Sequence, residues 1–209
     1  MKAVLTREII HSITSLGVIT PKDDVANVLM SIKLQRKGDT LEAVTTDRYV
    51  AVVAKYSDVL EFEGWEDGEG MLIDPKQLKS VADMLKREKR NVDPVSIHYD
   101  IDKEYAYAEV SQGTRVDLGA PRNVNSKFPP VERLFEVDRE PDGVPSLGLN
   151  PDFIAKLGKI LPPEVRPDRT RVWRFQFRST ETGKPGPVWA SYEGLNYQIE
   201  ALVQPALIK

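Results

Sequence analysis

The sequence contains no cysteine. Disulfides, thiolate zinc sites and cysteine nucleophiles are therefore excluded. It also has no run of about 18 apolar residues, the length that a membrane-spanning helix needs, and its first residues, MKAVLTREII, lack the apolar core of a signal peptide. We expect a soluble, cytoplasmic protein with no membrane association.

Residues suited to catalysis are scarce. The only two histidines, His11 and His98, lie far apart and have no metal-binding spacing. The G-x-S-x-G and G-x-G-x-x-G motifs are absent, and Gly183-Lys184 lacks the upstream glycine of a phosphate loop. The acidic residues between 61 and 69 lack the regular spacing of a calcium loop, which favours a solvated connector. We expect no enzymatic activity, no catalytic residues, no metal site and no cofactor.

Charge is unevenly distributed along the chain. The 29 basic and 32 acidic residues give a net charge of -3, which argues against a broadly basic surface of the kind that coats nucleic acid. Residues 75–90, however, contain six basic and two acidic residues, a local charge of +4. Any surface that binds nucleic acid must therefore be local.

The basic stretch has the pattern of an amphipathic helix. Asp74 is suited to cap it, and Pro75 fits the first helical position, where a missing N–H costs nothing. Leu78, Val81 and Leu85 recur at three- and four-residue spacing and predict a buried stripe. The other side carries the basic residues Lys76, Lys79, Lys86, Arg87 and Arg90.

This pattern occurs three times, which indicates an internal repeat. It returns 76 residues later, with Asn150-Pro151 as the cap and Ile154, Leu157 and Leu161 as the apolar stripe. A looser copy starts at Thr6, where Ile10 and Ile13 precede Leu78 and Val81 by 68 residues.

Valine- and threonine-rich segments follow each predicted helix. The first set includes a strand over residues 28–34 and two strands on either side of residues 46–48. We therefore predict an α+β fold of repeated βαβββ units, with antiparallel sheets and helices on one face. Units 1–60 and 70–136 would form one domain (1–136), joined by a linker (137–143) to a third unit (144–209). The third unit must pair its open edges with the first domain or with another copy of the chain.

Three segments resemble the bacterial DNA polymerase III beta subunit, the sliding-clamp family. Thr46-Asp47-Arg48-Tyr49 is similar to the family's Thr-Asp-Gly step. Residues 128–134, starting with Phe128-Pro129, resemble its Phe-Pro-Asp segment, and residues 201–206 resemble its C-terminal Val-Val-Met-Pro-Met. The order and spacing of the three segments support the resemblance, which implies a shortened form of a DNA clamp.

The resemblance implies that the helices line a hole around duplex DNA. Their polar sides would then contact phosphates without reading sequence, so that the ring can slide. A basic helix side is also compatible with a simple solvated surface. The predicted DNA-facing residues are Arg7, Lys76, Lys79, Lys86, Arg87, Arg90, Lys156 and Lys159.

The resemblance also implies a groove for short linear motifs of a DNA polymerase and a clamp loader. Arg48 stands where the family has glycine, and Gln204 and Ala206 replace methionines. The same positions are also compatible with ordinary strand and core packing. The predicted groove residues are Ala26, Thr46, Arg48, Tyr49, Ala51, Phe128, Pro129, Leu134, Leu202, Gln204, Pro205 and Ala206.

Our first functional hypothesis is a sliding-clamp-like processivity factor for DNA replication. It would be a homo-oligomeric ring that encircles duplex DNA and tethers a polymerase through the groove. The family's ring contains twelve βαβββ units, whereas this chain has three, so four copies would complete such a ring and two would not. The alternative is a clamp-derived interaction protein that binds clamp partners, or a clamp, without encircling DNA.

Overall fold

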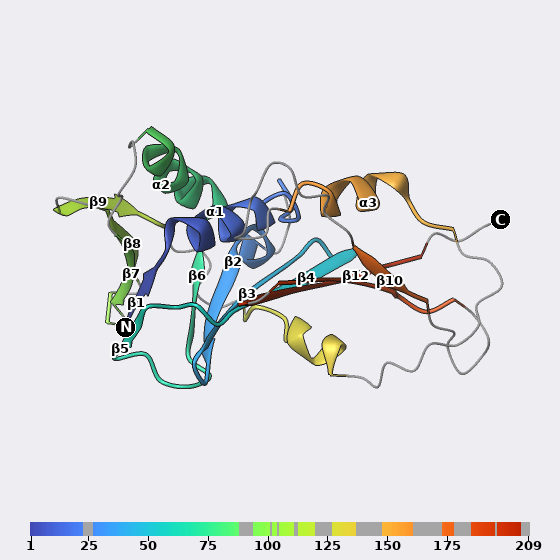
Figure 1. Cartoon of the computed structure of the whole chain (residues 1–209), viewed down its shortest axis with the longest axis horizontal. Helices are drawn as coiled ribbons and strands as arrows, with labels where there is room; N and C mark the ends of the chain where they lie inside the picture. The colour runs from blue at the N-terminus through green and yellow to red at the C-terminus, as the bar shows by residue number, and fades with distance from the viewer. Residues whose placement is uncertain are drawn as a thin grey trace.

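A computed structural model of the chain is shown in Figure 1. It describes residues 1–22, 27–87, 94–100, 102–103, 105–110, 113–119, 127–136, 148–160, 173–177, 185–194 and 196–205. Within these ranges the chain is built from antiparallel strands and three α-helices. No helix in the described ranges is long and apolar enough to cross a membrane.

The three α-helices begin where the capping residues predict. Helix α1 (Arg7–Leu16) is capped by the Thr6 hydroxyl, which accepts a hydrogen bond from the Ile9 amide. Helix α2 (Pro75–Arg87) follows Asp74, whose carboxylate accepts from the Lys76 amide at 2.7 Å. Helix α3 (Pro151–Leu157) is capped by Asn150 in the same way. Side-chain acceptors of this kind stabilise a helix start by about 1 kcal/mol.

The strands form two antiparallel sheets. The five-stranded sheet has the order β5 (Glu61–Glu63), β1 (Lys2–Leu5), β7 (Val95–Asp100), β8 (Tyr105–Val110) and β9 (Thr114–Asp117). The seven-stranded sheet has the order β10 (Arg174–Gln176), β11 (Val188–Glu193), β12 (Tyr197–Val203), β4 (Val50–Tyr56), β3 (Thr40–Thr46), β2 (Ile32–Lys37) and β6 (Gly70–Ile73).

The repeated units exchange strands rather than stand alone. Strand β1 of the first unit pairs with β7 of the second, and β6 of the second pairs with β2 of the first. The third unit joins them through β12, which pairs with β4 from Tyr197 opposite Tyr56 to Val203 opposite Val50. One edge of the third unit is therefore paired with β4, within the same chain.

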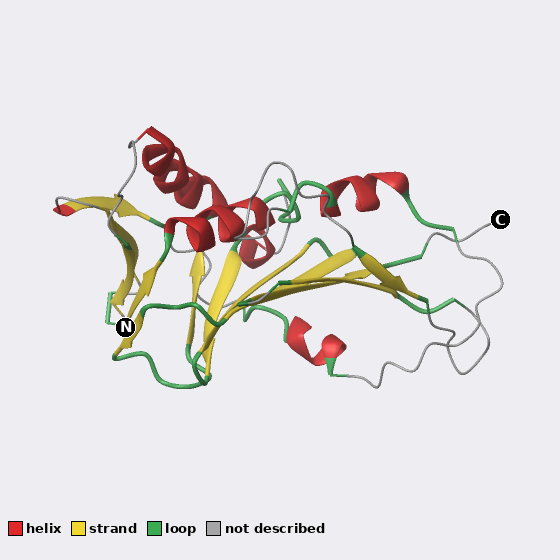
Figure 2. Cartoon of the chain, viewed as in Figure 1, coloured by secondary structure: helices red, strands yellow, loops and turns green. Residues whose placement is uncertain are grey.

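The apolar core lies between the sheets and the α-helices. Figures 1 and 2 show α1, α2 and α3 on one face of the sheets. The predicted stripe residues Ile10, Ile13, Leu78, Val81 and Leu157 are all buried in one continuous cluster. Burying such side chains stabilises the fold by about 1.5–3 kcal/mol each. Ile154 is only half-buried, and Leu161 lies outside the described residues.

Two local predictions were wrong. Residues 27–30 form a 3-10 helix, η1 (Asn27–Met30), and the strand predicted over 28–34 begins only at Ile32. The acidic connector was predicted as a loop, but its Glu61–Glu63 segment is strand β5. Trp65, in the same acidic connector just after β5, is 1% exposed and donates its indole N–H to the Glu69 carbonyl at 2.8 Å. One large aromatic side chain thus anchors an otherwise acidic segment.

The segment before the predicted linker crosses to the opposite face. Residues 131–135 form a 3-10 helix, η3 (Val131–Phe135), that lies on the face of the seven-stranded sheet away from α1, α2 and α3 (Figures 1 and 2). The predicted linker, residues 137–143, lies outside the described residues. We call the side with the three α-helices the helix face and the opposite side of the seven-stranded sheet the outer face.

Candidate nucleic-acid interface and partner groove

The polar sides of the α-helices are open to solvent along the helix face. Lys76, Lys79, Lys86 and Arg87 on α2 are exposed, and Arg7 on α1 is half-buried. Lys159, just after α3, is exposed, whereas Lys156 is half-buried. Arg90 lies outside the described residues. The structure thus places seven of the eight predicted DNA-facing residues on or beside the helices that share one face.

The charges of α2 are partly compensated within the helix. The Lys79 ammonium lies 2.5 Å from the Asp83 carboxylate, and the Lys86 ammonium lies 3.6 Å from it. The hydrogen bond from Lys79 holds the pKa of Asp83 below its ordinary value, so Asp83 is charged at neutral pH. The four bases on α2 with one acid leave a local charge of +3.

Helices α1 and α2 contribute charge to the same patch. Burial lowers the pKa of His11 on α1, and the nearby charges of Lys86 and Arg7 lower it further. A like charge lowers the pKa of an imidazole only when it is close. The charges of Lys86 on α2 and Arg7 on α1 thus both act on His11, opposed by Glu8 and Asp83, and the pKa of His11 stays below its ordinary value.

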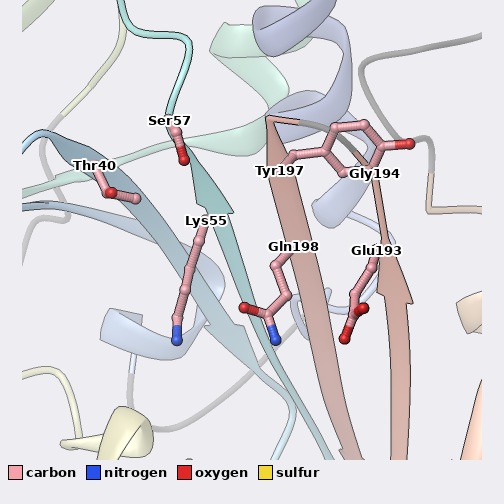
Figure 3. Close-up of a pocket in the computed structure, with 7 residues that line it drawn as sticks. All are labelled: Thr40, Lys55, Ser57, Glu193, Gly194, Tyr197 and Gln198. Carbon is pink, nitrogen blue, oxygen red and sulfur yellow. The ribbon is translucent and has the colours of Figure 1, made fainter.

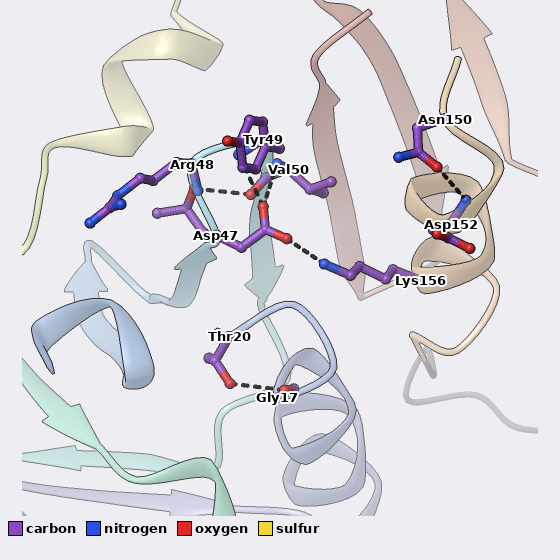
Figure 4. Close-up of polar contacts among 10 residues, drawn as sticks. Gly17, Thr20, Asp47, Arg48, Tyr49, Val50, Asn150, Asp152 and Lys156 are labelled. Atoms are coloured by element: carbon purple, nitrogen blue, oxygen red, sulfur yellow. Dashed lines mark hydrogen bonds and ion pairs between the residues drawn. The ribbon is translucent and has the colours of Figure 1, made fainter. Parts of the chain in front are cut away.

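Helix α3 contacts the turn between β3 and β4. The Lys156 ammonium is paired with the Asp47 carboxylate (Figure 4). The Tyr49 ring stacks on the Phe153 ring with centroids 5.8 Å apart. Lys156 was predicted to face DNA, but its ammonium is engaged by a carboxylate. Sequence reasoning missed this pair because its members are 109 residues apart.

The β3–β4 turn is fixed by its own side chains. Asp47 Oδ1 accepts hydrogen bonds from the Tyr49 amide (3.0 Å) and the Val50 amide (2.7 Å). The Thr46 hydroxyl accepts from the Arg48 amide at 3.1 Å and donates to the Val50 carbonyl. Arg48 has φ = 76°, the left-handed region that favours glycine. At this position the DNA polymerase III beta family, which the sequence resembles, has glycine.

The outer face carries a small apolar cluster, which we call the outer-face cluster. It contains the predicted groove residues Ala51 and Leu202, with Phe128 packed against it. The Phe135 and Trp189 rings meet edge to face at 5.2 Å. Sequence reasoning missed both of these anchors. The full cluster is Val44, Ala51, Val53, Val131, Phe135, Trp189 and Leu202.

The remaining predicted groove residues that the structure describes lie in the β3–β4 turn or in the segments that also contribute to this cluster. Thr46 pairs with Ala51 across β3 and β4, and the Tyr49 carbonyl accepts from the Gln204 amide at 2.9 Å. Tyr49 and Leu134 are 60% and 54% exposed, so they are available to a ligand. Arg48 is exposed, and Pro129 and Pro205 are half-buried. Ala26 and Ala206 lie outside the described residues.

A separate polar depression of about 410 Å³ lies at the other end of β4 and β12 (Figure 3). Lys55 in it is 3.5 Å from the buried carboxylate of Glu200. Its lining residues, which the sequence did not single out, are Thr40, Lys55, Ser57, Glu193, Gly194, Tyr197 and Gln198. Across the part of the chain that the structure describes, no group of three or more histidine or acidic side chains is placed to bind a metal ion.

No protein-family model and no curated protein matches the sequence, but solved structures match its fold. A DNA polymerase sliding clamp from Pseudomonas aeruginosa aligns with 100% of this chain and 67% of its own length, at a TM-score of 0.69 and 16% identity. The Helicobacter pylori beta clamp in complex with diflunisal aligns with 99% of this chain and 66% of its own length, at a TM-score of 0.67 and 13% identity.

A third match extends beyond the bacterial clamps. The structure of A. fulgidus PCNA with the C-terminal region of FEN-1 aligns with 100% of this chain and 99% of its own length, at a TM-score of 0.61 and 9% identity. The chain spans about two-thirds of the length of the two bacterial clamps above. The predicted α+β fold of repeated units is confirmed, and the chain has the fold of the sliding clamps, represented by the DNA polymerase III beta subunit.

Proposed function

We propose that this chain is a sliding-clamp-like processivity factor that forms a homo-oligomeric ring around duplex DNA and tethers a polymerase. The observation that carries the proposal is the arrangement of the clamp fold itself. Three helices from three repeated units lie on one face. Exposed basic side chains lie along α2 and directly after α3, and Arg7 on α1 is half-buried. The protein would act mechanically, through a topological link, rather than through chemistry.

The electrostatics support a phosphate-binding helix face. The whole chain is acidic, with a net charge of -3, while the solvent side of α2 carries a charge of +3. A local basic surface on an acidic protein favours nonspecific phosphate contacts and gives no means of reading bases. Such contacts permit sliding and weaken steeply as salt is added.

The free sheet edges support assembly of several copies. Among the described residues, β9 pairs only with β8 and β10 pairs only with β11. The two strands lie toward opposite ends of the molecule in Figure 1. Phe175 in β10 and the adjacent Phe177 are 37% and 40% exposed. Unpaired edges of this kind invite pairing with another chain, and head-to-tail contacts between copies close into a ring when the rotation permits.

The outer-face cluster is the proposed site for short linear motifs of a polymerase or loader. An apolar floor with the exposed Leu134 next to Phe135 suits an extended peptide that buries one or two hydrophobic side chains. Diflunisal, the ligand of the Helicobacter pylori complex, is a practical first probe of this surface.

The decisive experiment compares closed and open DNA. Light scattering first establishes whether the purified chain forms an oligomer. The protein is then loaded, with a loader if one is required, on a covalently closed circle and on the same DNA cut once. A topological ring stays on the circle after a high-salt wash and leaves the linear form, because salt removes only phosphate contacts.

Two results would contradict the proposal. A stable monomer at micromolar concentration would argue against a ring, and so would equal loss of protein from the circle and the linear form at high salt. Either result, combined with binding of diflunisal or a partner peptide, would favour the alternative of a clamp-derived interaction protein that does not encircle DNA.

A further inference from the structure

Helix α3 and the β3–β4 turn are joined by contacts between segments that are far apart in the sequence. Lys156 pairs with Asp47, and Phe153 stacks on Tyr49. The Lys156 ammonium also lies 5.7 Å from the centre of the Phe153 ring. Helix α3 therefore contacts both Asp47 and Tyr49 of the turn; Figure 4 shows the contact between Lys156 and Asp47.

The Asp47 carboxylate uses both oxygens to hold this arrangement. Oδ1 accepts from the Tyr49 and Val50 amides, and Oδ2 accepts from Lys156. The Asp47 side chain is only 9% exposed, whereas the Lys156 side chain is 30% exposed. A carboxylate this buried depends on its partners for compensation, because water reaches little of it. The lysine still has access to solvent and to another anion.

The turn also reaches the outer face. The Tyr49 carbonyl accepts from the Gln204 amide, which directly follows β12. Thr46 and Ala51, on either side of the turn, pair with each other, and Ala51 belongs to the outer-face cluster. A change in the position of the turn would therefore reach the border of the proposed groove.

We propose that Lys156 is a positioning residue for the β3–β4 turn, and that its pairing with Asp47 couples the helix face to the outer-face groove. DNA phosphates on the helix face compete with Asp47 for the Lys156 ammonium. Withdrawal of Lys156 loosens the turn, and by reciprocity a ligand that needs the ordered turn disfavours that withdrawal. The coupling rests on the proposed function, whereas the positioning role of Lys156 does not.

Hydrogen exchange of the Val50 amide, measured by NMR on the full chain, tests the positioning role without any ligand. Lys156→Met should raise its exchange rate about tenfold, because a hydrogen bond to a charged group stabilises more than a neutral one. Lys156→Arg should restore most of the protection. Lys159→Met, which removes an exposed lysine near the end of the same helix, is the matched control and should leave the Val50 rate unchanged.

A second variant separates the ion pair from the turn's own hydrogen bonds. Asp47→Asn keeps an Oδ1 acceptor for the Tyr49 and Val50 amides but removes the charge that Lys156 binds. It should raise Val50 exchange as Lys156→Met does, and the double variant should exchange no faster than either single one. Unchanged Val50 exchange in both single variants would overturn the positioning role.

The coupling is then tested with a short duplex DNA at low salt, with binding followed by fluorescence anisotropy. Bound duplex should raise Val50 exchange in the wild type at least about fivefold, the lower end of typical coupling, and should have no further effect in Lys156→Met. A duplex that binds without changing Val50 exchange overturns the coupling. A duplex that does not bind contradicts the DNA-binding function and the coupling together, while the variants still decide the role of Lys156.

Discussion

The hydroxyl groups of Ser12 and Tyr56 lie 2.9 Å apart and are fully buried. Ser12 is on α1 and Tyr56 ends β4, so this hydrogen bond fixes the position of the first helix on the seven-stranded sheet. Burial raises the pKa of Tyr56, and the hydrogen bond to Ser12 partly opposes that shift. The pair therefore remains neutral and bonded throughout the physiological pH range.

Removing the hydroxyl group of Ser12 alone should lower the free energy of unfolding more than removing the hydroxyl groups of both Ser12 and Tyr56. Ser12→Ala leaves the Tyr56 hydroxyl buried without its partner, and we expect a loss of about 1–3 kcal/mol in the free energy of unfolding. Tyr56→Phe added to Ser12→Ala should recover part of that loss. Urea denaturation of the two single variants and the double variant measures this. Strictly additive losses would show that the hydrogen bond does not connect the two residues energetically.

The backbone conformation of Arg48 predicts that glycine is more stable than alanine at this position. Its φ of 76° is accessible to glycine at no steric cost and is unfavourable for a residue with a Cβ. Arg48→Gly should therefore be more stable than Arg48→Ala by about 1 kcal/mol. Comparison with alanine removes the contribution of the arginine side chain from both variants. Equal denaturation midpoints would mean that the turn relaxes to another conformation when the side chain is shortened.

Local patterns predicted the helix starts because each cap acts on its own next turn. Asp74 and Asn150 precede proline, and the spacing of Leu78, Val81 and Leu85 fixes one buried side. These interactions span only a few residues, so the sequence alone contains the information. The same holds for the strands on either side of the turn at Asp47.

The exchange of strands between units could not be predicted in this way. The pairing of β1 with β7 joins residues ninety or more positions apart, and no local sequence pattern indicates its register. The ion pair of Lys156 with Asp47 was missed for the same reason. The error at Trp65 had another cause, because the surrounding acidic residues concealed one buried aromatic side chain.

Two adjacent residues of η3 distinguish folding from binding on the outer face. Phe135 is buried against Trp189, so Phe135→Ala should cost about 3–5 kcal/mol in stability. Leu134 is more than half exposed, so Leu134→Ala should change stability by less than about 0.5 kcal/mol. The proposed groove predicts that Leu134→Ala nevertheless weakens the binding of a short hydrophobic partner peptide, measured by calorimetry. Unchanged binding in that variant would remove Leu134 from the site.

Charge reversal on α2 tests the helix face. Lys76→Glu combined with Arg87→Glu should weaken duplex binding and reduce the dependence of log K on log salt, by about 0.9 for each phosphate that the variant no longer neutralises. Lys103→Glu, a reversal in the turn between β7 and β8, is the control and should have little effect. If Lys103→Glu weakens duplex binding as much as the α2 variant does, binding depends on the net charge of the protein rather than on the basic residues of the helix face.

The two histidines allow the most direct test of where DNA contacts the protein. His11 lies on α1, on the helix face, and burial together with the charges of Lys86 and Arg7 lowers its pKa. His98 lies on the five-stranded sheet, where its ring stacks on Tyr107 at 4.6 Å, and burial lowers its pKa as well. Phosphates near His11 favour its charged form, so bound duplex should raise that pKa and leave His98 unchanged.

An NMR pH titration of both imidazoles, with and without duplex DNA, measures these two pKa values in one sample. Our account predicts that the pKa of His11 rises by about 1 when DNA is bound, because an opposite charge within a few ångströms has an effect of that size. His98 serves as the internal control. A pKa of His11 that does not change while the duplex is bound, or an equal rise at His98, would contradict the assignment of DNA to the helix face.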